Sequence, residues 1–287
     1  MRGVIVAGIL FLVTVFAAVA VEPVDSTPPR VIRPVYAAYT VGVGPGELTD
    51  TYLSPIRYTG TAFSLNYERS QAMRFAPEVW TMRLSASLQG MHTRNIARNA
   101  TMWSGELYLS WGMDRRWRIS GGVTLAAGGS TSLSLGCLYN ERNGNNPVSA
   151  KASWTVNLTG YASWNTRIGS LPVTLCYRPT FPVAGVFFSP DYGELYYEIY
   201  LGDSSGLCRM AWWGSYLSID NLLTADFRFG ATSLRVGYSG RLLSTKTSDI
   251  NTRIISNSIV IGISGEWMSL DPRKHPSPQC ARIISAL

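Results

Sequence analysis

The chain has 287 residues, of which 46% are hydrophobic, 11% aromatic and 15% charged, with a formal net charge of +7. This composition, together with 27 glycines, argues against a disordered chain. Lysine and arginine are scattered along the sequence, so the basic pI of about 9.3 gives no reason to expect a nucleic acid partner.

Residues 1–20 predict a cleaved signal peptide. A positive start at Arg2 precedes an apolar run, and Ala18-Val19-Ala20 has the small residues of a cleavage site. A retained anchor is the alternative, because a run of about 17 apolar residues is near the lower limit for a spanning helix. We expect an extended periplasmic leader over 21–35, the folded body over 36–269, and a tail without clear structure over 270–287.

The segment 149–165 has the most regular pattern in the chain. Apolar residues, among them Trp154, Val156 and Trp164, alternate at every step with polar ones such as Lys151 and Asn157. Strict period two indicates an extended strand with two different faces. The segment exceeds the roughly 9 to 11 residues with which a tilted strand crosses a membrane, and its two tryptophans have the spacing of two aromatic girdles.

The same alternation recurs along the chain and predicts twelve strands: 36–44, 60–70, 79–92, 99–113, 117–125, 149–165, 171–180, 194–200, 209–219, 222–229, 233–245 and 255–267. An even number places both termini on one side. Tight turns at 114–115, 169–170 and 230–232 would then be periplasmic, and long loops at 45–59 and 128–147 external.

These observations predict an all-β fold, a transmembrane antiparallel up-and-down β-barrel of about 12 strands. The expected location is the outer membrane of a Gram-negative cell, and the expected partners are outer-membrane lipid and the barrel assembly machinery. The rival interpretation is a soluble secreted β-sandwich that binds carbohydrate through its tryptophans and tyrosines. The oligomeric state stays open.

The inward faces of the predicted strands suggest a charged lumen. Its candidate binding residues are Arg178, Glu194, Tyr196, Glu198, Tyr200 and Lys151. A wider network of paired charges is expected to fill and stiffen the lumen: Glu68, Arg83, Glu106, Arg118, Lys151, Asp226, Arg228, Arg235 and Arg241. The stretch 181–193, with two prolines and two phenylalanines, is expected to fold inward over the lumen mouth. A loop packed on its external neighbours is the alternative.

Catalysis is not expected. An outer-membrane lipid hydrolase needs a histidine beside its serine, and of the two histidines His92 shares the lipid-facing side of its strand. The cysteines Cys137, Cys176, Cys208 and Cys280 lack metal-site spacing, so neither a metal nor a cofactor is predicted. Packed or free thiols are favoured, although the disulfide state stays open. The molecular activity is expected to be that of a small channel or transporter for a small solute, or of a surface scaffold.

Four segments resemble a known family: YLSPIRYTG at 52–60, YNERNGNNPVSA at 139–150, PVAGVFFSPDYGELYYEIYLG at 182–202 and NLLTADFRFGATSLRVGYSGR at 221–241. The sequence is similar to a Bacteroidetes outer-membrane family known as domain of unknown function 3316. The resemblance implies location and architecture only, because the family has no assigned activity or catalytic residues.

Overall fold

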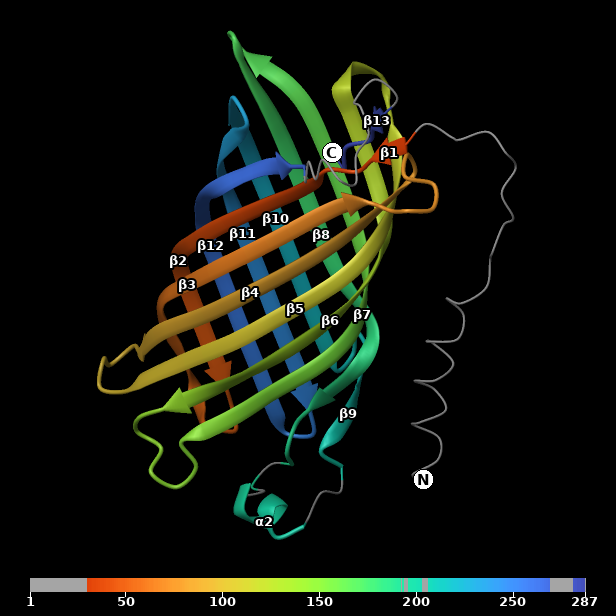
Figure 1. The fold of residues 1–287 in the computed structure, drawn as a ribbon. Coiled ribbons are helices and arrows are strands. Elements are labelled where there is room, and N and C mark those ends of the chain that lie inside the picture. Colours follow the sequence, from red (N-terminus) through yellow and green to blue (C-terminus); the bar gives the residue numbers. More distant parts are fainter. Residues whose placement is uncertain (1–29, 192, 194–195, 203–205, 269–280, 287) are drawn as a thin grey trace, which may run out of the picture.

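Ten long antiparallel strands close into a barrel in the computed structural model, which describes residues 30–191, 193, 196–202, 206–268 and 281–286. Each strand pairs with its neighbours in the chain, and the ring closes through β12–β2 and β8–β10. The wall, shown in Figure 1, consists of β2 (Val35–Asp50), β3 (Ser54–Ala72), β4 (Trp80–Asn95), β5 (Thr101–Arg118), β6 (Val123–Asn140), β7 (Val148–Ile168), β8 (Leu171–Phe188), β10 (Tyr216–Phe229), β11 (Thr232–Thr247) and β12 (Ile250–Trp267).

The predicted antiparallel barrel is therefore confirmed, but the count of twelve strands is wrong. No turn interrupts the chain at 114–115, because Asp114 lies inside β5 and faces the lumen. The segments 209–219 and 222–229 are not two wall strands, since β10 runs unbroken through Asp220 and Asn221. Residues 196–200 form the short helix α2 (Tyr196–Tyr200), and the expected loop 128–147 is mostly strand β6.

Two of the prolines inside wall strands, Pro45 and Pro182, lie at places where the pairing is irregular. Pro45 on β2 pairs with Thr61 on β3, whereas the β12–β2 ladder skips positions 44 and 45. Pro182 on β8 lies beside a register shift at Val156/Asn157 of β7. A proline has no N–H to donate, so an irregular ladder accommodates it. The expected long loop over 45–59 is wrong, because β2 and β3 extend to a short turn at 51–53.

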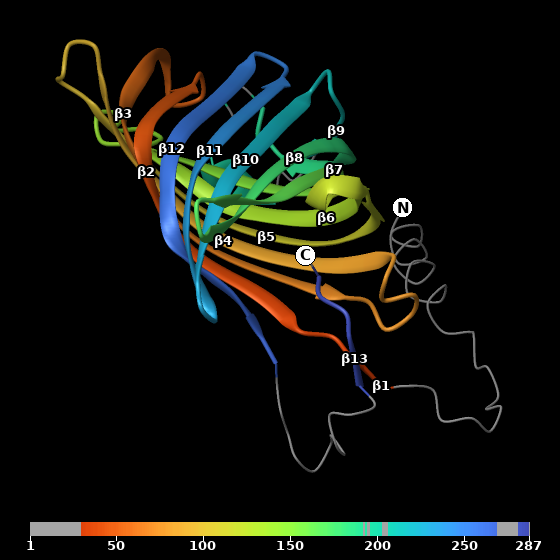
Figure 2. The same ribbon diagram turned by 90° about the horizontal axis from the view of Figure 1, so that it is seen from above.

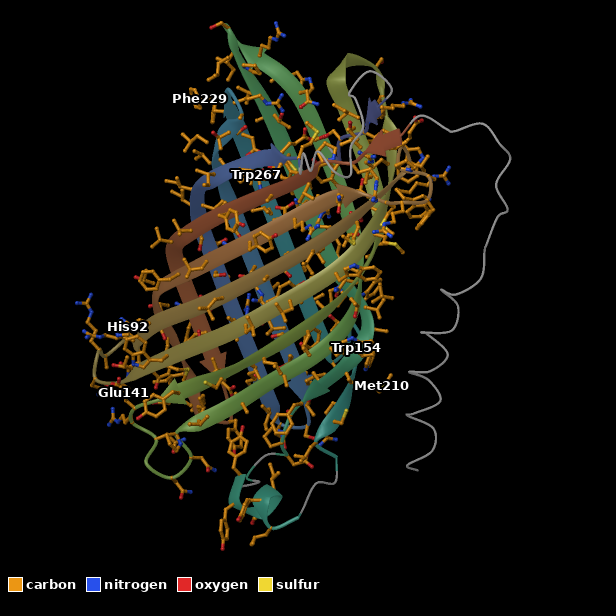
Figure 3. All side chains as sticks on the ribbon, viewed as in Figure 1. His92, Glu141, Trp154, Met210, Phe229 and Trp267 are labelled. Atoms are coloured by element: carbon orange, nitrogen blue, oxygen red, sulfur yellow. The ribbon has the colours of Figure 1, made fainter. Side chains whose placement is uncertain are left out.

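The two faces of the wall have opposite chemistry. On β7, Trp154, Val156, Leu158 and Trp164 are exposed on the outside, while alternate polar residues are buried. Figure 3 shows side chains projecting from the whole outer surface, with Phe229 and Trp267 toward one end and His92 and Trp154 toward the other. The β-sandwich alternative is wrong, because the ten strands form one closed ring and not two packed sheets. In the described part of the chain, no helix is long and apolar enough to cross a membrane.

The two ends of the barrel differ in their connections. The end that holds both described termini, here the terminal rim, carries the connections 73–79, 119–122, 169–170 and 230–231. The opposite end, here the loop rim, carries 51–53, 96–100, 141–147, 248–249 and 189–215, which includes α2 and the short strand β9 (Cys208–Ala211). The turns at 169–170 and 230–231 lie where we predicted them, and the long loop is the one at 189–215.

A small second sheet lies at the terminal rim. Strand β1 (Arg30–Ile32) pairs in parallel with β13 (Ala281–Ile283), and Figure 2 shows the two segments side by side below the barrel wall. The backbone N–H of Ile284 also donates to the carbonyl of Ile32 at 2.9 Å. Residues 281–286, expected to lack clear structure, therefore dock at the barrel. The predicted signal peptide lies outside the described residues.

Candidate functional site

Three ion pairs cross the lumen, each between strands that lie five places apart in the ring of ten and hence on opposite walls. Arg178 on β8 binds Glu68 on β3, Arg241 on β11 binds Glu106 on β5, and Lys151 on β7 binds Asp50 on β2. They lie in this order from the terminal rim toward the loop rim. Inward parity places each side chain in the lumen, and the pairs tie the two walls together.

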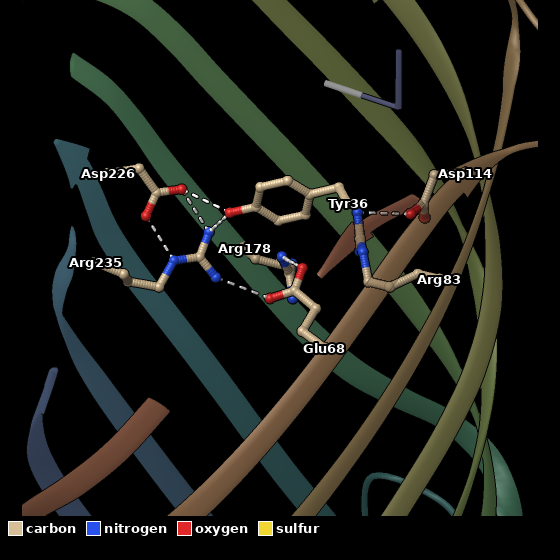
Figure 4. A network of polar contacts seen from close by, with 7 residues as sticks. All are labelled: Tyr36, Glu68, Arg83, Asp114, Arg178, Asp226 and Arg235. Carbon is tan, nitrogen blue, oxygen red and sulfur yellow. Dashed lines mark hydrogen bonds and ion pairs between the residues drawn. The ribbon is translucent and has the colours of Figure 1, made fainter. Parts of the chain in front are cut away.

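The first pair belongs to a denser layer, the belt, which consists of Tyr36, Glu68, Arg83, Asp114, Arg178, Asp226 and Arg235 (Figure 4). Arg235 donates from Nε and NH2 to the two oxygens of Asp226, both at 2.7 Å, and from NH1 to Glu68 at 3.2 Å. The Tyr36 hydroxyl donates to Asp226 at 2.7 Å. Three arginines face three carboxylates, so the belt is neutral.

The remaining pair of the belt joins neighbouring strands. Arg83 on β4 contacts Asp114 on β5 at 2.9 Å, and the hydroxyl of Thr159 donates to the same carboxylate. The guanidinium carbons of Arg83 and Arg178 lie 5.2 Å and 5.9 Å from the centre of the Tyr161 ring. Hydrogen bonds and ring contacts thus fix these arginines across the lumen.

The C-terminal segment closes the lumen beneath the belt. Arg116 donates from NH1 to the carbonyl of Ser285 and from NH2 to that of Pro77, each at 2.7 Å. Ala286 is buried against Tyr36 and Ala38. The gap between the belt and Ala286 has a volume of only about 10 Å³, which is roughly the space that one water molecule needs. The terminal end of the lumen is therefore shut.

At mid-height of the lumen, Arg241 contacts two acidic side chains, one through two short hydrogen bonds and the other through a longer ion pair. Glu106 accepts from NH1 at 2.8 Å and from NH2 at 2.7 Å, whereas the carboxylate of Asp220 lies 3.4 Å from Nε. The Nε atom has no hydrogen-bond partner among the described residues, although only 7% of the Arg241 side chain is exposed. The Asp220 side chain is 31% exposed to the interior. The hydrogen-bonding capacity of Arg241 and Asp220 is therefore only partly used in this corner of the lumen.

An apolar layer, the external cluster, fills the lumen at the loop rim. The rings of Phe187 and Tyr216 pack with centroids 5.4 Å apart, and Met91 and Leu243 lie in the same layer. The full cluster comprises Leu48, Leu53, Tyr58, Ala62, Met91, Ala100, Met102, Leu138, Phe187, Ala211, Tyr216, Leu243 and Ile254. The expected inward position of Phe187 is confirmed. However, 181–188 belongs to β8, and Phe181 and Val183 face outward.

The helix α2 covers this cluster from outside. The Tyr196 hydroxyl accepts a hydrogen bond from the backbone N–H of Ala150 at 2.6 Å, and its ring lies near those of Phe188 and Tyr52. Partial burial raises the pKa of the Tyr196 hydroxyl, while the bond from Ala150 opposes the rise. The side chain acts as an anchor that holds the external connection 189–215 on the barrel mouth.

Two cavities remain between these closures. The larger, of about 170 Å³, lies between the belt and Arg241 and extends along β4 from Arg83 to Met91. The smaller, of about 40 Å³, lies between Glu106 and Lys151 and reaches Phe187 and Phe188. They follow one another toward the loop rim, so a solute that entered from that side would meet them in series.

The candidate binding residues predicted from the sequence lie in two different parts of the structure. Arg178 and Lys151 lie in the lumen, but Tyr196, Glu198 and Tyr200 are on α2 outside it, and Glu194 is outside the described residues. Of the expected network, Arg118 and Arg228 are exposed near the terminal rim. The sequence interpretation missed Tyr36, Asp50, Asp114 and Asp220. Inward parity on the correct strands is the signal that would have found them.

His92 and three of the four cysteines lie among the described residues. His92 stacks on Trp103 on the outer surface, with ring centroids 4.3 Å apart. Cys137, Cys176 and Cys208 are free thiols, and Cys280 lies outside the described residues. In the described ranges, no group of three histidine, cysteine or acidic side chains could hold a metal ion.

Solved structures similar to this chain are bacterial β-barrel proteins. The transport unit of the autotransporter AIDA-I from Escherichia coli has a TM-score of 0.45 and 8% identity, covering 92% of this chain and 98% of its own. The translocator domain of NalP from Neisseria meningitidis has a TM-score of 0.39 and 8% identity, covering 82% and 88%. A Pseudomonas aeruginosa FadL homologue has a TM-score of 0.31 and 10% identity, covering 83% and 90%. All three scores are low, and no property of this chain is inferred from them.

A comparison with curated proteins gave no match. The sequence profile of the family described as protein of unknown function (DUF3316) matches residues 6–274. The match spans the whole barrel, from before β2 to beyond β12, and agrees with the family that the four sequence segments resemble. This chain belongs to the DUF3316 family.

Proposed function

We propose that this protein is an outer-membrane barrel of a Gram-negative, Bacteroidetes-type cell, exported through a cleaved signal peptide and inserted by the barrel assembly machinery. An apolar outer face on ten membrane-length strands supports this location. The terminal rim then faces the periplasm, and the loop rim with its 189–215 connection faces the exterior.

We further propose that the barrel is a gated pathway for a small solute, closed in the conformation described. The observation that carries this proposal is the pair of cavities that lie in the lumen between two closures. The closure at the loop rim consists of side chains such as Phe187, and the closure at the terminal rim includes the segment 281–286. If the lumen served only as a rigid filler, we would not expect a cavity of about 170 Å³ within it.

A surface scaffold is the second candidate, and a different observation favours it. The three cross-lumen ion pairs join opposite walls and oppose any widening of the barrel. In a scaffold, the lumen would be a rigid filler and the external connections would be the working part.

Solute uptake by proteoliposomes separates the two candidates. The wild type is compared with protein-free liposomes and with a widened variant, in which Arg178, Arg235, Phe187 and Tyr216 are all replaced by alanine. Uptake by the wild type above the protein-free rate supports the pathway. If the folded wild type takes up nothing while the widened variant does, the protein is inserted but closed to solutes, and the scaffold is the better account.

A further inference from the structure

The larger lumenal cavity has the size of a small ring. Its volume of about 170 Å³ compares with the engineered cavity of about 150 Å³ that holds one benzene molecule. It lies between the belt and Arg241, on the membrane-spanning strands themselves, so its walls are as fixed as the barrel. A six-membered ring therefore fits without rearrangement of the wall.

The lining of the cavity combines apolar surface with many hydroxyl groups. Twelve of the residues around it are serine or threonine, joined by Asn66 and Gln89. Hydroxyls both donate and accept hydrogen bonds, so they suit a partner that does the same. An apolar ring would leave many of these groups without partners, at a cost for each.

Each arginine that lines the cavity already has a carboxylate partner, in the lining or directly behind it, which disfavours an anion. The belt is neutral, with three arginines facing three acids, whereas at the other end the single Arg241 faces both Glu106 and Asp220. The excess negative charge resides at Asp220, whose carboxylate is accessible to the cavity and lies 3.4 Å from Arg241 Nε. An incoming anion would meet this charge without a free cation to oppose it.

Asp220 offers an acceptor to the cavity, and Arg241 lies beside it. The Nε–H of Arg241 has no partner, and the carboxylate of Asp220 has only that long contact among the described residues. A ligand hydroxyl can donate to the accessible carboxylate of Asp220, whereas the buried Nε of Arg241 lies behind it and holds it in place. Thr180 and Ser239 lie on the neighbouring strands and line the same cavity.

From this geometry we propose that the mid-lumen cavity binds one neutral polyhydroxylated six-membered ring, a monosaccharide or a cyclic polyol, with Asp220 as its principal contact. The binding site rests on the proposed function only for the route of entry, which runs from the loop rim past Phe187 and the smaller cavity.

Thermal unfolding and calorimetry of the full chain in detergent micelles test the site. The probes are D-glucose and myo-inositol, with cyclohexanol as a ring bearing one hydroxyl and ethanolamine as a small cation. At least one of the two polyols should bind and raise the unfolding midpoint, and cyclohexanol should not. Asp220→Asn should weaken polyol binding about tenfold or more, since it removes the charged acceptor. Asp249→Asn, on the exposed 248–249 turn, should leave it unchanged.

The possible outcomes discriminate clearly. Absence of binding by both polyols overturns the site, and so does equal binding by wild type and Asp220→Asn. Binding of ethanolamine alone, lost in Asp220→Asn, would make it a cation site instead. If Asp220→Asn does not fold, Ser239→Leu, which fills part of the cavity, must abolish polyol binding. Polyol binding without uptake in proteoliposomes refutes the pathway and keeps the site, whereas uptake without binding refutes the site alone.

Discussion

Arg241 on β11 and Glu106 on β5 join opposite walls of the barrel through two parallel hydrogen bonds, NH1 to Oε2 at 2.8 Å and NH2 to Oε1 at 2.7 Å. The side chains are 7% and 15% exposed, so the pair is largely shielded from solvent. Such a fork fixes both the distance and the angle between the two strands. This pair, here called the strut, therefore helps to hold the two opposite walls of the barrel together.

Replacement of Glu106 by Gln tests this strut. We expect the free energy of unfolding to fall by about 3 kcal/mol, because removal of one partner leaves the other charge enclosed and poorly compensated. Urea unfolding in lipid vesicles measures the change. The control is Glu47→Gln, which removes an outer pair with Arg57 at 3.6 Å whose side chains are 26% and 58% exposed. An effect there of less than about 1 kcal/mol is expected, and equal effects of the two changes would contradict the strut.

An arginine scan of one outward face tests the membrane position. Val156 and Ile168 both point outward from β7, the first in mid-strand and the second beside the turn at 169–170. Val156→Arg should destabilise the barrel by about 2 to 4 kcal/mol, and Ile168→Arg by no more than about 1 kcal/mol, since the cost of a charge falls toward the membrane surface. Unfolding in vesicles provides both values. Similar costs at the two positions would count against a lipid-facing band.

Protease-cleavable tags test the orientation. Gly144 lies in the 141–147 connection of the loop rim, and Gly169 occupies a tight turn at the terminal rim with φ of 64°. A tag inserted at 144 should be cut by added protease on intact cells, whereas one at 169–170 should be cut only after the outer membrane is opened. The reverse result would invert the barrel.

Arg116 and its neighbour Arg115 provide a matched test of the C-terminal segment. Arg116 points inward and binds the carbonyls of Ser285 and Pro77, while Arg115 points outward against Trp117. Arg116→Gln should speed amide hydrogen exchange of Ile284, whose N–H is bonded to Ile32. Arg115→Gln should not. Unchanged exchange in Arg116→Gln would show that the segment is held without this contact.

The sequence predicts the faces of the strands better than their ends. Alternation on 149–165 depends only on which side of one strand faces lipid, and the structure confirms it. Asp114-Arg115 and Asp220-Asn221 resemble turns because polar pairs favour turns in soluble proteins. In a barrel, an inward acid is stable mid-strand when a partner faces it, as Arg83 does for Asp114.

The partners across the lumen could not be predicted, because they depend on the strand count. In a ring of ten, opposite strands are five places apart, but in a ring of twelve they would be six places apart. Alternation alone therefore places Lys151 in the lumen without identifying its partner. In the structure the Lys151 ammonium lies 2.7 Å from the carboxylate of Asp50, whose side chain is completely buried. Loss of Lys151 would therefore leave this buried carboxylate without its cation. The helix at 196–200 was missed for a related reason, because five residues are too few to separate the two periodicities.

The seat of residues 281–286 also has a consequence for the order of events during assembly. This segment follows β12 in the chain, and the lumen into which Ala286 fits exists only once β12 has joined β2. Docking of residues 281–286 in the closed ring must therefore follow the pairing of β12 with β2. A barrel with an open β12–β2 seam would offer this segment no closed ring in which to dock.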